Sequence, residues 1–252
     1  MPLSRKGRAV GVGEGGPIYI LHAEVSKENF NMCGRYAVTP GEFSDLRLRF
    51  NLSEILLFKP RYNIAPTQLA PVVTNQKGTN RMEQFRWGLV PFWARDTSIG
   101  NRMINARAET VVTKPSFNDL FKNRRCLVLA SGFYEWRREG RRKVPMWIKL
   151  KTGESFVFAG LWDSWKQPDG SMLRTYTIIT TEPNAMLLPI HNRTPVMLND
   201  DDALTWMNYD ALGDALSLLK PFPAELMDCY EVSALVNNPQ NDLAECIDPI
   251  DG

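Results

Sequence analysis

The chain has 252 residues, of which 44% are hydrophobic and 23% charged. This is an ordinary globular composition, and it excludes disordered and fibrous chains. No apolar stretch approaches the roughly 18 residues that a membrane helix needs, since even residues 18–25 are interrupted by His22 and Glu24.

The predicted elements start after an N-terminal appendage at residues 1–31, which is crowded with glycine and lacks an amphipathic period. The sequence pattern of residues 32–252 is typical of one compact domain. Short β-type runs bounded by turn residues predict strands at 69–74, 81–87, 126–136, 144–150, 155–161 and 172–180. Helices are predicted at 41–51, 115–122, 183–188, 200–207 and 209–219, and several of these segments open with Ser, Asp or Pro, as helix N-termini do. Without regular βαβ alternation, this order predicts an α+β fold with mostly antiparallel strands.

Charge is distributed unevenly along the chain. Residues 81–149 hold 15 Lys and Arg against 6 Asp and Glu, whereas residues 199–252 hold 1 against 12. One interpretation is a solvated basic face balanced by an acidic one. The other is a surface for phosphates and unstacked bases, because the basic segment is interleaved with aromatic residues: Trp87, Phe92, Trp93, Phe117, Phe121, Phe133, Tyr134, Trp136 and Trp147.

The first basic residues of the chain lead into glycine-rich sequence and not into an apolar core. We therefore expect no secretory signal and a cytoplasmic protein. The four cysteines share no CxxC spacing, and only two histidines are present. A Cys/His zinc site is poorly supported by this pattern, so we expect no metal and no other cofactor.

Three short stretches contain residues suited to acid–base chemistry. His191 lies in a polar loop bracketed by two prolines; such loops present functional side chains, although a lone histidine is often structural. Glu135 lies among aromatic residues after the most apolar strand. A carboxylate there is either salt-bridged or desolvated and ready for proton transfer. Asn105 and Arg107 would face the same side of an extended segment.

Six sequence blocks follow one another between residues 32 and 240: MCGRY at 32–36, RYNIAPT at 61–67, WGLVPFW at 87–93, NARAET at 105–110, GFYEW at 132–136 and HNRTP at 191–195. Each block alone is weak evidence, but the ordered set resembles the SOS response-associated peptidase (SRAP) family. The resemblance implies curved, barrel-like, mostly antiparallel sheets with helices packed around them. It also implies a function, because members protect abasic sites in single-stranded DNA by forming a covalent DNA–protein crosslink.

The nucleophile of this family is a cysteine at the mature N-terminus, which corresponds here to Cys33. A ring-opened abasic site is an aldehyde, and a free α-amine attacks it to give a Schiff base that the neighbouring thiol closes into a thiazolidine. A cysteine inside the chain offers only an amide nitrogen. An α-amine, with a pKa near ~7.7–8.0, is partly neutral at physiological pH.

The resemblance assigns further catalytic roles. Glu135 would take a proton from the α-amine or assist opening of the sugar ring, and His191 would exchange protons with the sugar oxygen. Asn105 would hold the substrate or the reacting amine by hydrogen bonds.

The resemblance also implies a DNA-binding set. Arg35 and Arg107 align with arginines that contact phosphates, whereas Trp93, Asn63 and Pro66 align with positions that stack on or wedge between bases. Ser131 and Lys114 depart from the pattern of many relatives, which leaves details of DNA contact open.

The extension at residues 1–31 is the largest departure, because it would leave Cys33 without a free amine. We expect it to be removed or never made. If the extension is removed, one alternative is that the protein is a thiol autopeptidase that cleaves before Cys33. A lyase-like activity is a further expected activity. A module that binds single-stranded DNA without chemistry is another alternative. The expected partner is abasic single-stranded DNA on the bacterial nucleoid, with no membrane. The sequence identifies no protein partner, and the replication machinery is a candidate.

Overall fold

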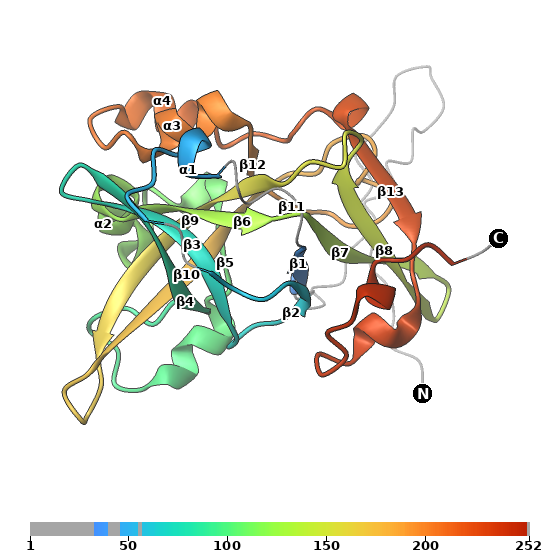
Figure 1. Cartoon of the computed structure of the whole chain (residues 1–252), viewed down its shortest axis with the longest axis horizontal. Coiled ribbons are helices and arrows are strands. Elements are labelled where there is room, and N and C mark those ends of the chain that lie inside the picture. The colour runs from blue at the N-terminus through green and yellow to red at the C-terminus, as the bar shows by residue number, and fades with distance from the viewer. Residues whose placement is uncertain (1–32, 40–45, 55–56, 251–252) are drawn as a thin grey trace, which may run out of the picture. The chain divides into compact units, whose positions relative to one another are not determined.

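The computed structural model describes residues 33–39, 46–54 and 57–250, which all lie in a compact unit spanning Asn31–Gly252. The expectations for residues 1–31 lie outside the described residues. Two β-sheets and the helices packed on them form the unit (Figure 1). Within the described ranges, no helix is both long and apolar enough to cross a membrane.

Five long strands form a closed barrel. In barrel order they are β10 (Met172–Thr181), β4 (Thr79–Trp87), β3 (Leu69–Gln76), β6 (Arg125–Ala130) and β9 (Phe156–Lys166). β9 pairs with β10 and closes the ring. All neighbours are antiparallel except β4 and β10, which pair in parallel. Fully buried aromatic side chains such as Phe85, Trp87, Phe158 and Tyr176 fill the core, so the barrel is packed and has no channel.

A smaller antiparallel sheet adjoins the barrel. Its strands are, in order, β13 (Met227–Glu231), β8 (Arg142–Leu150), β7 (Gly132–Glu139), β1 (Tyr36–Val38) and β2 (Arg61–Ile64). One face shares the barrel core through Tyr36 and Phe133. The other face forms a separate apolar cluster with the segment after β13. The short strand β1 therefore lies between two cores and is fully buried.

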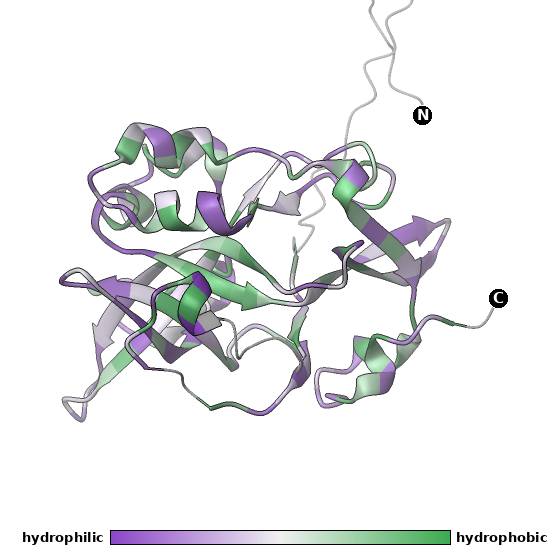
Figure 2. Cartoon of the chain, turned by 45° about the horizontal axis from the view of Figure 1, so that its top comes forward, coloured by the Kyte–Doolittle hydropathy of each residue, from purple (hydrophilic) through white to green (hydrophobic). Residues whose placement is uncertain are grey.

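Helices and short elements complete the fold. They are α1 (Leu46–Arg49), α2 (Pro115–Asn123), α3 (Asp200–Met207) and α4 (Leu212–Ser217), the strands β5 (Asn105–Arg107), β11 (Thr194–Pro195) and β12 (Met197–Leu198), and the 3-10 turns η1 (Thr97–Arg102), η2 (Ala108–Thr110), η3 (Ala224–Leu226), η4 (Ala234–Asn237) and η5 (Ala244–Cys246). α3 starts at Asn199, whose side chain accepts a hydrogen bond from the Asp202 amide at 2.8 Å. The helices carry both hydrophilic and hydrophobic residues (Figure 2), as expected of elements with one face on the barrel.

Arg125 joins α2 and α3 to the barrel. Its side chain is fully buried, and its guanidinium donates to the main-chain carbonyls of Phe121, Trp206 and Asn208 at 2.8, 2.6 and 2.5 Å. The rings of Phe121, Trp206 and Tyr209 lie 5.0–5.7 Å from Cζ. Carbonyls at two helix C-termini are thus satisfied by one cation.

The α+β class, the mostly antiparallel pairing and the barrel-like sheets are confirmed. The predicted single strand at 126–136 is wrong: the chain crosses from the barrel to the smaller sheet, so β6 ends at Ala130 and β7 begins at Gly132. A Cβ on Gly132 would lie 2.3 Å from the Trp147 ring, so only glycine fits at the crossing. The strands β1, β2 and β13 were missed because they are short.

Two helix predictions need correction. Residues 185–188 form turns and not a helix, and the Asn184 side chain accepts a hydrogen bond from the Leu187 amide at 3.0 Å and donates to the Phe222 carbonyl at 2.8 Å. The helix predicted at 209–219 is shorter and spans Leu212–Ser217. Of the helix predicted at 41–51, only Leu46–Arg49 is seen, and residues 41–45 lie outside the described residues.

Candidate active site

Cys33 lies directly before β1 and is held by side chains from two other strands. Its main-chain nitrogen donates to Glu135 Oε1 at 2.8 Å, and Asn105 Nδ2 donates to its carbonyl oxygen at 3.4 Å. The residue is buried and has a φ of 21°, which is unusual for a residue other than glycine. The predicted residues Cys33, Asn105 and Glu135 are thus in direct contact.

Pairing between β1 and β7 positions Glu135. Tyr36 pairs with Phe133, and the Tyr134 amide donates to the Arg35 carbonyl at 3.0 Å. The Glu135 side chain is only 3% exposed. Burial raises the pKa of Glu135 to about 8, although hydrogen bonds from the amides of Cys33 and Trp136 oppose the shift. Of the two sequence-based alternatives, the structure favours a desolvated carboxyl able to exchange protons near neutral pH.

The thiol of Cys33 lies in the same apolar surroundings. Burial raises the pKa of the Cys33 thiol well above its ordinary value, and the nearby Glu135 carboxylate adds to the rise. The sulfur is therefore kept as a neutral thiol, which distinguishes this site from those that hold a resting thiolate.

His191 lies on the turn between β10 and β11 and is half-buried. Its Nδ1 lies 3.2 Å from the Arg193 amide and 3.3 Å from the Arg193 carbonyl. Because an amide can only donate, we assign Nδ1 as the acceptor and the ring proton to Nε2. Burial lowers the pKa of His191, so the neutral ring is favoured.

Arg193 connects the His191 turn to the segment that carries Asn105. Its guanidinium forms an ion pair with Glu109, in which Nη2 lies 2.9 Å from Oε2, and also donates to the Thr180 carbonyl at 2.6 Å. β5 in turn pairs with β10, with Asn105 opposite Ile178. Sequence reasoning assigned no role to Arg193 or Glu109, although both occur in the quoted blocks.

The predicted DNA-binding residues differ in accessibility. Arg107 is exposed and Pro66 is half-buried in the turn after β2. Arg35 is half-buried, and its Nη1 donates to Asn63 Oδ1 at 2.8 Å and to the Val236 carbonyl at 2.6 Å. Asn63 is fully buried, and its Nδ2 lies 2.8–3.1 Å from three main-chain carbonyls of residues 236–241. Its side chain therefore ties β2 to the segment after β13 and supports Arg35.

Trp93 lies on a loop that exposes two neighbouring aromatic side chains. Trp93 is 54% and Phe92 is 70% exposed. Three hydrogen bonds to neighbouring strands fix the loop backbone. The Val90 amide donates to Thr175 Oγ1 at 2.8 Å, and the Phe92 amide donates to Asp163 Oδ2 at 2.9 Å. Trp165 Nε1 donates to the Ala94 carbonyl at 2.7 Å. The rings are thus presented on a rigid support, which sequence reasoning did not foresee.

Two glycines close this loop. A Cβ on Gly88 would lie 2.6 Å from the Gly100 carbonyl oxygen, and a Cβ on Gly100 would lie 2.7 Å from the Gly88 oxygen. Gly88 also has a φ of 112°, which other residues rarely adopt. Backbone contact at this point holds the middle of η1, which leads toward Asn105, against the end of β4.

No group of three or more His, Cys, Asp or Glu in the described ranges could hold a metal ion. Residues 32–239 match the family model for SOS response associated peptidase (SRAP). The chain belongs to the SRAP family. Among its relatives, abasic site processing protein YoqW of Bacillus subtilis (strain 168) is 45% identical over 223 residues, which cover 86% of this chain and 99% of that protein.

More distant relatives share the same region. Abasic site processing protein HMCES of Gallus gallus is 31% identical over 265 residues, covering 87% of this chain and 78% of that protein. A crystal structure of a protein from Bacteroides thetaiotaomicron superposes with a TM-score of 0.78 at 28% identity, covering 86% of this chain and all of that one. This SRAP fold therefore extends over most of the chain.

Proposed function

We propose that this SRAP protein recognises abasic sites in single-stranded DNA and joins them covalently through Cys33. The observation that carries the proposal is the 2.8 Å contact between the Cys33 main-chain nitrogen and the buried carboxyl of Glu135. This contact aligns a proton acceptor with the atom that becomes the α-amine when Cys33 is the first residue. The relatives named as abasic site processing proteins support the substrate class.

The proposed reaction is a condensation. The neutral α-amine of Cys33 adds to the aldehyde carbon of the opened sugar, and loss of water from the adduct gives a Schiff base. The thiol then adds to the C=N carbon, while its proton ends on the nitrogen. One aldehyde and one aminothiol thus give one thiazolidine and one water, and no oxidant or cofactor is needed.

The pKa of Glu135 suits this chemistry. At about 8 it is close to the value of an ordinary α-amine, so a proton passes between the two groups at little cost. Because the Cys33 thiol is kept neutral, the amine attacks first and the sulfur closes the ring afterwards. We assign to the Nε2–H of His191 the proton exchange with the sugar oxygen that opens the ring, and to Asn105 the holding of the Cys33 backbone.

DNA contacts in this proposal come from the exposed Arg107 and Trp93 and from the half-buried Arg35 and Pro66. Arg107 and Arg35 bind phosphates, and Trp93 stacks on a neighbouring base, with Pro66 alongside. Asn63 contributes through the Arg35 guanidinium that it holds. Such contacts do not read sequence, so the lesion itself gives the specificity. A cytoplasmic protein acting on the nucleoid and beside the replication machinery fits this substrate.

The decisive experiment compares the protein beginning at Cys33 with the full chain retaining residues 1–32, each incubated with an abasic oligonucleotide. Only the former is expected to give an adduct that survives heat and detergent, and mass spectrometry verifies each N-terminus. Cys33→Ala should form only a Schiff base, which borohydride traps. Equal crosslinking by a protein verified to retain residue 32 would overturn the amine mechanism.

A self-cleavage before Cys33 is a second candidate activity. It is favoured by the strained φ of Cys33 and by the hydrogen bond that its peptide nitrogen, the leaving group of such a cleavage, donates to Glu135. Purified full-length chain should then lose residues 1–32 on incubation, whereas Cys33→Ala should stay intact. A full-length protein of constant mass would exclude this activity.

A further inference from the structure

The edge of the smaller sheet is closed by a side chain and not by another strand. β2 is the last strand of this sheet, and its only strand neighbour among the described residues is β1. An edge strand leaves main-chain N–H groups without partners. In β2, the amides of Tyr62 and Asn63 donate to one oxygen, Oδ1 of Asp242, at 2.6 and 2.9 Å. A carboxylate from the C-terminal part of the chain therefore completes this edge.

The two amides reach the same oxygen because β2 is bulged. Tyr36 pairs with Ile64 and Val38 pairs with Arg61, so β2 has two residues where β1 has one. Successive N–H groups of a regular strand point to opposite sides, and a regular strand could not offer both amides to one oxygen. A bulge re-aims the side chains of its strand and is common beside functional sites. The side chain that this bulge re-aims is that of Asn63.

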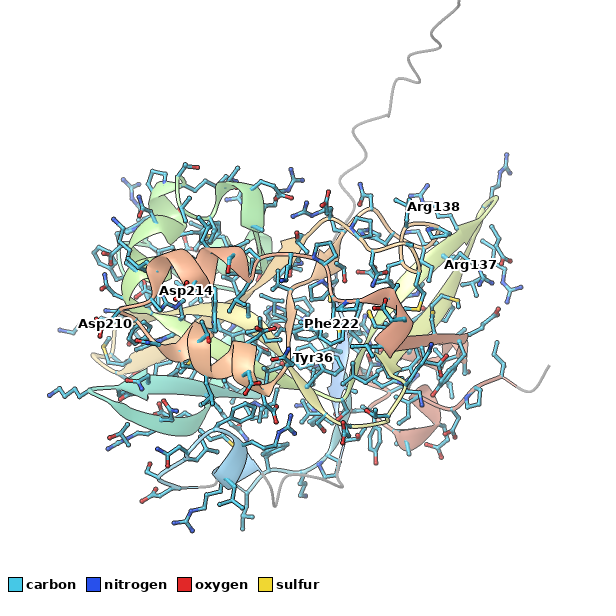
Figure 3. All side chains as sticks on the ribbon, turned by 90° about the horizontal axis from the view of Figure 1, so that it is seen from above. Tyr36, Arg137, Arg138, Asp210, Asp214 and Phe222 are labelled. Carbon is cyan, nitrogen blue, oxygen red and sulfur yellow. The ribbon has the colours of Figure 1, made fainter. Side chains whose placement is uncertain are left out.

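Asn63 passes this placement on to Arg35. Its Oδ1 accepts a hydrogen bond from Arg35 Nη1 at 2.8 Å, while its Nδ2 holds the carbonyls of residues 236–241. The backbone beside Arg35 is fixed independently, because β1 lies between β7 and β2. In Figure 3, Tyr36 of β1 lies near the middle of the view, between Asp214 of α4 and Arg138 of β7. Only the side chain of Arg35 is left to be positioned.

Arg35 keeps part of its guanidinium for another ligand. Both hydrogen bonds that it makes among the described residues use Nη1, one to Asn63 and one to the Val236 carbonyl at 2.6 Å. The ring of Trp136 lies 5.8 Å from its Cζ and supports the group from one side. Nε and Nη2 therefore stay available in a fixed orientation, as binding of a phosphate requires.

The second oxygen of Asp242 acts on the turn after β2. Oδ2 forms an ion pair with Arg61 Nε. Arg61 Nη2 donates to Gln68 Oε1 at 2.6 Å, and the same Gln68 oxygen accepts a hydrogen bond from the Ala65 amide at 3.1 Å. These bonds span the turn that carries Pro66. One carboxylate is thus connected to two of the candidate DNA-binding residues.

We propose that Asp242 is a positioning residue for DNA binding, which holds the Arg35 guanidinium toward a phosphate and the Pro66 turn toward a base. Oδ1 acts through the β2 bulge and Asn63, and Oδ2 acts through Arg61. The inference rests on the proposed function, in which Arg35 and Pro66 contact DNA, and it adds the residue that sets their geometry. A carboxylate repels DNA by its charge, so weaker binding after its removal has to come from lost positioning.

The test measures binding to a single-stranded oligonucleotide with a tetrahydrofuran abasic analogue, which has no aldehyde and so reports binding alone. Asp242→Ala should lower the affinity about tenfold, as expected for loss of one charged hydrogen bond. It should also lower the slope of log Kd against log salt by about 0.7, for one phosphate contact on a single strand.

The double variant decides whether Asp242 acts through Arg35. Arg35→Ala should lower the salt slope as much as Asp242→Ala does, and Arg35→Ala/Asp242→Ala should lower it no further. A merely structural role would leave the salt slope of the folded protein unchanged. An unchanged slope in folded Asp242→Ala, or a further fall in the double variant, would overturn the proposal.

Two more variants control for charge and for folding. Glu245→Ala removes the same charge from an exposed position in η5 and should bind at least as tightly as wild type. Asp242→Asn keeps an oxygen for the two amides and should recover the wild-type salt slope, and melting temperatures show that each variant is folded. A slope of Asp242→Asn as low as that of Asp242→Ala would contradict the role of the bulge.

Crosslinking to a natural abasic site separates this inference from the proposed function. In the protein beginning at Cys33, Asp242→Ala should raise the DNA concentration for half-maximal crosslinking more than it lowers the maximal rate, because Asp242 contacts neither Cys33 nor Glu135. Wild-type protein that binds the analogue but forms no adduct would overturn the proposed function alone. Arg35→Ala protein that binds the analogue like wild type would overturn the positioning role and the assigned phosphate contact together.

Discussion

Two junctions of the fold each bury an ionisable side chain, but in different ways. Arg125 lies where α2 and α3 meet the barrel, and Glu135 lies where β1 pairs with β7. Arg125 donates to three carbonyls and contacts three rings, so each of its neighbours gains from its presence. Glu135 is buried in an apolar setting in which only two amides oppose the desolvation of its charge. Burial with full hydrogen bonding stabilises the fold, whereas incomplete compensation leaves a group that changes protonation readily.

The largest effect on folding is expected from the first of these junctions. Arg125→Ala would leave buried carbonyls of both helices without donors and should lower the free energy of unfolding by about 3–5 kcal/mol. Chemical denaturation measures the loss, and crosslinking per folded molecule should stay unchanged. Arg125→Lys keeps the charge and should lose less. A crosslinking defect in the folded fraction would show that the two junctions are coupled.

Glu135→Gln should have the opposite profile. It removes the proton acceptor and should slow adduct formation by about 10²–10⁴-fold, while non-covalent binding to the abasic analogue stays near wild type. At pH 8 the variant should be at least as stable as wild type, because a neutral amide replaces a costly buried charge. A large loss of stability with normal chemistry would instead assign Glu135 a structural role.

The stabilities of wild type and of Glu135→Gln should also depend differently on pH. The folded-state pKa of Glu135 is about 8, above the unfolded value of about 4.3. Folding therefore favours the protonated form, and wild type should lose stability as pH rises from about 4.5 to about 8. Below this window both states are protonated and nothing is lost. Urea midpoints of Glu135→Gln across the same range should lack this component, and parallel curves would contradict the shift.

A smaller effect is expected at Arg193, which positions His191 without contacting the reacting atoms. Arg193→Gln removes the ion pair with Glu109 and should slow crosslinking roughly tenfold by loosening the turn. Arg193→Lys should recover part of the rate, and Glu109→Gln should cause a milder loss. If Arg193 acts through His191, its substitution should shift the pH at which the crosslinking rate changes. A merely structural change would lower the rate by the same factor at every pH.

Sequence reasoning found the elements whose signals are local. Proline at the start of α2 and aspartate at the start of α3 marked both helices to within a residue. It could not find β1 or β2, whose three and four residues acquire order only from their partners. Nor could it see that Asn63 and Arg35 share the Val236 carbonyl, because that contact joins residues about two hundred positions apart.

The candidate site shows the same limit. The residue pattern marked His191, Glu135, Asn105 and Arg107, and the resemblance supplied Cys33 and Arg35. The 2.8 Å contact from Cys33 to Glu135 depends on the crossing at Gly132, where one predicted strand becomes two. The absence of a Cβ at Gly132 therefore decides the geometry, and the hydrophobic periodicity of the sequence does not reveal it.

The contact between Gly88 and Gly100 holds the two ends of the segment between them together, and the large side chains exposed at the tip of this segment are Phe92 and Trp93. Because its two ends touch through backbone atoms, residues added at the exposed tip cost only about 0.6 kcal/mol per doubling of loop length. Asn105 is placed separately, by the pairing of β5 with β10. Exchanging Phe92 and Trp93 for other aromatic residues should therefore change which neighbouring bases are preferred while the crosslinking rate of bound DNA stays constant, so that recognition and reaction can evolve separately in one small domain.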